Sequence, residues 1–164
     1  AELIKSLKVH GKGSNKYDNI RIGVNSRLDT IQAAVLNVKL TALIEHELDD
    51  VNRVYKLYNE RLDGVVEVPL IPEGFYSSFA QYTIKLKNKE QREELQAKLK
   101  DQGIPSMIYY PKPMHKQEAF FDLKFDDEDY TVTNGLCNTV LSIPIHPYIS
   151  REDTERICKV IKMR

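Results

Sequence analysis

Apolar residues recur at helical spacing across residues 26–62, and no Pro or Gly interrupts this stretch. Ser26 and Asp29 have the spacing of a capping box that would start the helix. At 1.5 Å per residue, a straight helix of this length would measure on the order of 55 Å, so it must bend or connect two bodies. The polar residues 45–50 are where we expect a bend. Residues 32–35 offer a face of small side chains that permits close approach of a partner helix or a second subunit.

After residue 64 the pattern changes to short extended runs that alternate with helices. Residues 110–130 form a long loop rich in proline and aromatic residues, of a kind that is usually functional. The predicted strands are 65–68, 79–87 and 104–109, and the predicted helices are 88–100, 132–137 and 150–163, with Asn88 and Ser150 as N-caps. This order predicts an α+β fold: a long N-terminal helix followed by a short antiparallel sheet that is covered by helices on one face.

Composition and charge exclude several classes of function. The 164 residues carry 24 Lys and Arg against 24 Asp and Glu, so the net charge is zero and neither nucleic acid nor an anionic membrane is an expected partner. No apolar run is long enough to span a bilayer. Cys137 and Cys158 lack metal-binding spacing, and we interpret them as reduced core thiols of a cytoplasmic protein.

The start of the predicted long helix is a candidate anion site. Free backbone N–H groups at a helix N-terminus favour a phosphate or carboxylate, and Asn25 and Arg27 could both bind one there. The alternative is structural, with Asn25 stabilising a turn and Arg27 pairing with Asp29 on the surface. Residues 1–9 resemble a helix without a start signal, so we expect further chain to precede them.

The segment 109–115 is a second candidate, because it places Tyr109, Tyr110, a lysine and His115 directly after a predicted strand. Tyrosines packing over prolines is the alternative. His146 lies between two prolines, which favours a structural turn, and the acidic residues 45–50 favour a solvated helix face. No nucleophile grouping and no metal-ligand spacing occurs, so we predict no catalytic residue and no metal.

Four segments together resemble the DegT/DnrJ/EryC1/StrS family of PLP-dependent sugar-nucleotide aminotransferases, which belong to fold type I. These segments are residues 9–11, 23–34, 110–115 and 141–150. Within the family, residues 18–30 and 80–83 are most similar to aminotransferases that act on UDP-2-acetamido-2-deoxy-3-oxo-glucuronate.

The resemblance implies that this chain is the C-terminal part of such an enzyme. The expected organisation is the end of the large PLP domain and a connecting loop (1–25), an interdomain and dimer helix (26–62), and a small α+β domain (63–164). The lysine that binds PLP covalently would lie upstream, so the chain alone would be inactive. The implied partners are a keto-sugar nucleotide, an amino donor such as glutamate and a second copy in a homodimer, with a role in surface-polysaccharide or glycan biosynthesis. A non-catalytic binding module that keeps the small-domain fold is the alternative.

The resemblance also assigns roles to individual residues. It implies that Asn25 reaches the PLP phosphate across the dimer interface and that Arg27 meets the substrate carboxylate. Tyr110 matches a tyrosine near the sugar nucleotide, while Tyr109 stands where the family often has histidine, which puts a charged contact there in doubt. His115 matches a family position and is a further candidate for substrate binding.

Overall fold

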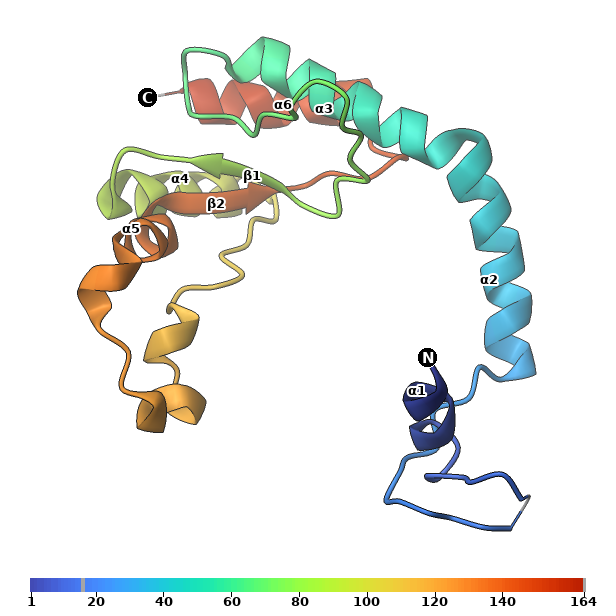
Figure 1. The fold of residues 1–164 in the computed structure, drawn as a ribbon. Coiled ribbons are helices and arrows are strands. Elements are labelled where there is room, and N and C mark those ends of the chain that lie inside the picture. The colour runs from blue at the N-terminus through green and yellow to red at the C-terminus, as the bar shows by residue number, and fades with distance from the viewer. Residues whose placement is uncertain (16, 164) are drawn as a thin grey trace. The chain divides into compact units, whose positions relative to one another are not determined.

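The computed structural model describes residues 1–15 and 17–163 (Figure 1). The chain divides into two compact units, Ala1–Glu45 and the part that begins at His46. The boundary lies within the stretch predicted as one long helix. No helix in the described part of the chain is long and apolar enough to cross a membrane.

The first unit begins with α1 (Glu2–Leu7), and the chain then doubles back on itself. Val24 donates to the carbonyl of Leu7 at 2.8 Å and accepts from the His10 N–H at 3.0 Å. Two glycines permit this close approach: a Cβ on Gly11 would lie 1.8 Å from the Arg21 carbonyl oxygen. A Cβ on Gly23 would lie 2.2 Å from the Gly11 nitrogen, so neither position can hold a side chain without a backbone shift.

The predicted long helix consists of three segments. α2 (Thr30–Ala42) starts four residues later than expected, because the Asp29 carboxylate caps it by accepting from the Gln32 N–H at 2.8 Å. The predicted capping box led by Ser26 is therefore wrong. A π-helical segment, Leu43–Glu47, separates α2 from α3 (Leu48–Leu62), and it overlaps the polar residues at which a bend is expected.

α2 carries apolar side chains on more than one side, interrupted by a polar stripe of Thr30, Asn37 and Thr41. None of its residues is buried, and five large apolar side chains are each more than half exposed. They are Ile31, Val35, Leu36, Val38 and Leu40. Large apolar side chains exposed together on more than one side of a helix are normally covered by protein, so α2 needs other surfaces to cover it.

The second unit is built on an antiparallel pair, β1 (Tyr82–Lys85) and β2 (Val140–Ile143), with Tyr82 opposite Ile143. β2 is absent from the sequence prediction. The strands predicted at 65–68 and 104–109 are reduced to single bridges, from Glu67 to Lys85 and from Met107 to Ser142. The helices of this unit after α3 are α4 (Lys89–Asp101), α5 (Thr131–Thr139) and α6 (Arg151–Lys162).

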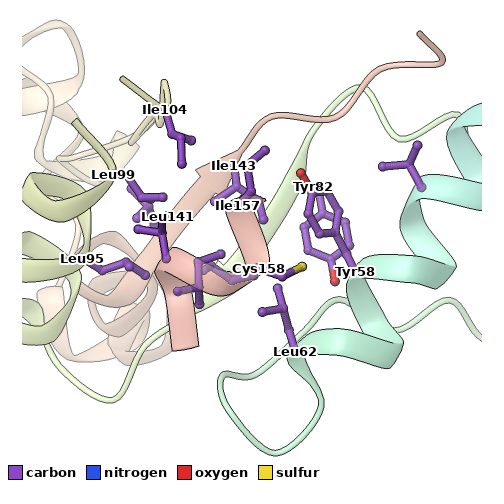
Figure 2. Packing of buried hydrophobic residues seen from close by; sticks show 14 of the residues in the cluster. Tyr58, Leu62, Tyr82, Leu95, Leu99, Ile104, Leu141, Ile143, Ile157 and Cys158 are labelled. Atoms are coloured by element: carbon purple, nitrogen blue, oxygen red, sulfur yellow. The ribbon is translucent and has the colours of Figure 1, made fainter. Parts of the chain in front are cut away.

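The hydrophobic core lies between one face of this pair and helices α3, α4 and α6 (Figure 2). Alternation along the strands directs Tyr82, Ile84, Leu141 and Ile143 to that face, and all four are buried. The helices contribute Tyr58, Leu62, Leu95, Leu99, Ile157 and Cys158. Both predicted N-caps of this unit are confirmed: the Asn88 side chain accepts from the Gln91 N–H, and the Ser150 hydroxyl from the Asp153 N–H, each at 2.9 Å.

Candidate functional site

The face of the sheet opposite the core carries polar side chains. Thr83 and Ser142 are cross-strand partners on this face, and their hydroxyl oxygens lie 2.8 Å apart. The Met107 N–H donates to the Ser142 carbonyl and the Ser142 N–H to the Met107 carbonyl, each at 2.9 Å, which adds a third row to the sheet. Because side chains alternate along an extended backbone, Tyr109 projects from the same face as Met107.

A pocket of about 340 Å³ opens over this face. Thr83, Ser142, Gln81 and Val140 form its floor. One wall comes from the segment that begins at Met107, and the other from α5. The first wall consists of Met107, Tyr109, Tyr110, Pro113 and Met114, and the second of Thr133, Leu136 and Cys137. The pocket therefore combines apolar walls with hydroxyl and amide groups, which suits a ring that has both apolar and hydrogen-bonding edges.

The structure brings the two predicted tyrosines into this pocket. Tyr109 is 50% exposed and Tyr110 is 64% exposed, so both phenols are available to a ligand. Sequence reasoning missed the floor, because Gln81, Thr83 and Ser142 became neighbours only through the pairing of β1 with the unpredicted β2. The alternation of Gln81 and Thr83 with buried Tyr82 is the one signal that could have indicated them.

The two histidines considered from the sequence, His115 and His146, differ in their surroundings. His115 is outside the described lining of the pocket: its side chain is 6% exposed, stacks on Tyr130 at 4.3 Å between ring centroids, and lies 2.9 Å from the Asp127 carboxylate. His146, interpreted from sequence as part of a turn, lines an adjoining hollow of about 270 Å³ together with Tyr109.

Asn25 and Arg27 lie in the first unit, and both are exposed. A β-bridge to Val9 fixes the backbone of Asn25. Among the described residues Arg27 forms no ion pair with Asp29, whose carboxylate caps α2. The expected anion site at free helix N–H groups therefore needs correction: Asp29 already occupies the helix start, and Asn25 precedes Thr30 by several residues.

The described residues contain no group of three or more His, Cys, Asp or Glu side chains that could hold a metal ion. The pocket is instead lined by neutral donors and acceptors. Its chemistry is thus recognition by hydrogen bonding and ring packing.

The model of the DegT/DnrJ/EryC1/StrS aminotransferase family matches residues 1–162. The chain belongs to this family. Among family members, it is 37% identical over 162 residues to the UDP-2-acetamido-2-deoxy-3-oxo-D-glucuronate aminotransferase of Pseudomonas aeruginosa, covering 98% of this chain and 43% of that protein. It is 33% identical to the dTDP-3-amino-3,6-dideoxy-alpha-D-galactopyranose transaminase of Aneurinibacillus thermoaerophilus, covering 98% and 44%.

Solved structures of the DegT/DnrJ/EryC1/StrS family have the same fold. A family aminotransferase from Brucella abortus superposes with a TM-score of 0.90 at 45% identity, over 98% of this chain and 42% of that one. DesV of S. venezuelae, solved in complex with a ketimine intermediate, superposes with a TM-score of 0.88 at 26% identity, over 98% and 43%. The predicted α+β small-domain fold is confirmed, and the chain spans less than half the length of the relatives it matches.

Proposed function

We propose that this chain is the C-terminal part of a PLP-dependent aminotransferase that transfers an amino group, from a donor such as glutamate, to a keto-sugar nucleotide. The supporting observation is the family match over residues 1–162, together with relatives whose names are those of sugar-nucleotide aminotransferases. The product would serve surface-polysaccharide or glycan biosynthesis in the cytoplasm.

The exposed apolar surface of α2 supports a larger assembly. The proposed enzyme has an upstream PLP-binding domain, and it is a homodimer. Two large surfaces would then be available to cover a helix that exposes large apolar side chains on more than one side. In this arrangement residues 1–25 and α2 connect the two domains and join the subunits, and the unit that begins at His46 includes the small domain.

Asn25 fits a contact to the PLP phosphate. Its backbone is fixed by the bridge to Val9, and its exposed amide can donate to an anionic oxygen. PLP supplies the electron sink that makes amino-group transfer possible. This chain would contribute one phosphate donor from Asn25 and leave covalent attachment to a lysine upstream, so it does not transaminate alone.

The pocket over the sheet, in the second unit, would bind the sugar nucleotide, and Arg27, in the first unit, has a separate proposed role toward the substrate carboxylate. Arg27 is exposed and has no ion-pair partner among the described residues, so its guanidinium is available for a bidentate contact with a uronate carboxylate. Tyr109 and Tyr110 would pack against the substrate and donate hydrogen bonds to it. The similarity to a 3-oxo-glucuronate aminotransferase supports a uronate substrate.

The test is to express the chain together with the reading frame that precedes it, and to assay the purified protein with PLP, glutamate and UDP-2-acetamido-2-deoxy-3-oxo-glucuronate. We expect amino-sugar formation by the longer protein and none by residues 1–164 alone. A native gene without an upstream PLP domain would contradict the proposal and favour a non-catalytic binding module. Turnover by the isolated chain would contradict the assignment of the covalent lysine to the upstream part.

A further inference from the structure

One carboxylate connects the two walls of the pocket that contains Tyr109 and Tyr110. Asp127, in the 3-10 helix Asp127–Tyr130, receives three contacts on its Oδ1 atom. His115 Nε2 lies at 2.9 Å, Lys116 Nζ at 2.6 Å and Asn134 Nδ2 at 2.9 Å. The Asn134 amide also donates to the Asp127 backbone carbonyl at 3.1 Å. We refer to these four residues as the Asp127 junction.

The three donors belong to different walls. His115 and Lys116 directly follow Pro113 and Met114, which line the pocket. Asn134 lies in α5, immediately after Thr133 and two residues before Leu136, which line the opposite wall. Besides the junction, the two sides are linked by the stacking of His115 on Tyr130, which directly precedes α5, by the intervening chain, and by their separate contacts with the sheet.

The electrostatics of the junction favour the ionised carboxylate. Lys116, His115 and Asn134, in that order, hold the pKa of Asp127 well below its usual range by hydrogen bonding. The stacking of His115 on Tyr130 further restricts the imidazole. Charge-assisted bonds with ionised partners are shorter and stronger than neutral ones, so one side chain can restrain both segments even though it is 56% exposed.

We propose that Asp127 is a positioning residue that holds the Tyr109–Tyr110 wall and the α5 wall at a fixed separation, and so sets the width of the substrate pocket. This inference rests on the proposed function for the identity of the ligand, but the coupling of the walls does not. His115 accordingly acts through Asp127, in place of a direct contact with substrate.

Amide hydrogen exchange measured on this chain tests the coupling. In Asp127→Ala we expect exchange to accelerate about tenfold in both 107–116 and 131–136, because three hydrogen bonds to one acceptor are lost. Peptides from α3 and α6 should keep wild-type protection, which shows that the core remains folded. Asp127→Asn should give a smaller effect, because an amide oxygen still accepts but no longer attracts Lys116 as an ion. The matched control is Asp129→Asn, which removes the same charge from the same 3-10 helix and should change neither peptide.

Acceleration in only one wall, or an equal effect in Asp129→Asn, would overturn the coupling. In the complete enzyme, Asp127→Ala should raise KM for the sugar nucleotide about tenfold and change kcat less than about twofold, because the walls bind substrate without touching the reacting atoms. Loosened walls with an unchanged KM would overturn the positioning role. If no aminotransferase activity is found, the proposed function fails while the exchange result still decides the coupling.

Discussion

The Tyr58 hydroxyl donates a 2.7 Å hydrogen bond to the carbonyl oxygen of Pro144, which lies 86 residues further along the chain. Tyr58 is fully buried in α3, and Pro144 directly follows β2. The bond therefore fixes the residue after β2 against α3. Burial raises the pKa of the Tyr58 phenol, so the hydroxyl keeps its proton and remains a donor.

We predict that Tyr58→Phe lowers the free energy of unfolding by about 1–3 kcal/mol, because the partly buried Pro144 carbonyl loses its donor. Urea denaturation followed by circular dichroism measures the change. Tyr148→Phe is the control: it removes an exposed phenol that donates to Glu47, and should cost less than about 1 kcal/mol. Equal effects of the two substitutions would contradict this interpretation.

The cap of α4 gives a second stability prediction. Asn88→Ala should cost about 1 kcal/mol, Asn88→Gly a few tenths and Asn88→Ser close to nothing, because only alanine both lacks an acceptor for the Gln91 N–H and disfavours the cap backbone. The denaturant midpoint should be lowest for the alanine variant, higher for glycine and highest for serine. Ser26→Ala serves as the comparison and should be neutral, since Asp29 caps α2.

Arg92 is a buried charge whose bonding is incomplete. It is 5% exposed and donates from Nη1 to the Cys137 carbonyl at 3.1 Å and from Nη2 to the exposed Glu93 carboxylate at 3.5 Å, while its Nε has no partner among the described residues. The free-energy cost of removing the guanidinium from water offsets much of the stabilisation that its hydrogen bonds provide. Arg92→Met should therefore cost less than about 1 kcal/mol, whereas Arg92→Ala should cost about 2–4 kcal/mol through the cavity that it leaves. Equal losses of unfolding free energy in Arg92→Met and Arg92→Ala would mean that the charge itself stabilises the fold.

Cys158 predicts how stability depends on alkaline pH. Burial raises the pKa of its thiol from 9.0 to about 11. Above pH 9 the unfolded thiol loses its proton while the folded thiol keeps it, so the free energy of unfolding falls as pH rises from about 9 to 11, by at most about 1.4 kcal/mol per pH unit from this group. Cys158→Ala should show a shallower slope in urea titrations across this range. An unchanged slope would assign the alkaline loss to other groups.

Arg27 separates substrate recognition from folding. In the complete enzyme, Arg27→Ala should lower kcat/KM on the keto-uronate, with a loss of about 2–5 kcal/mol in transition-state stabilisation. The kcat/KM on a neutral keto-hexose analogue should stay unchanged. Arg27→Lys should recover little, because a lysine cannot form the bidentate contact. Equal losses on both substrates would assign Arg27 to folding or cofactor binding, and no loss on either would make it a surface residue.

The sequence was most informative where the determining interaction is local. Asn88 and Ser150 accept from N–H groups three residues away, so residue type and local pattern identified both helix starts. Ser26 failed because Asp29, in the same short segment, is an equally good cap, and spacing cannot rank the two.

Long-range pairing was the part that local patterns did not reveal. β2 has only four residues and is followed directly by Pro144, and buried Ser142 interrupts its apolar pattern because it faces Thr83 across the sheet. The floor of the pocket depends on this pairing, so it too was missed. Tyr109 and Tyr110 could be proposed as candidates because residue type and position after a predicted strand are local features of the sequence.

The exposed apolar side chains of α2 have a consequence for how the protein folds. If its covering surfaces come from an upstream domain and a second subunit, then this helix is completed only when they arrive, and association becomes part of the folding equilibrium. The thermal midpoint of the whole protein should therefore rise with protein concentration. A dilute solution would lose α2 and the segment that presents Asn25 before it loses the core around Tyr82, whose contacts are all made within the second unit.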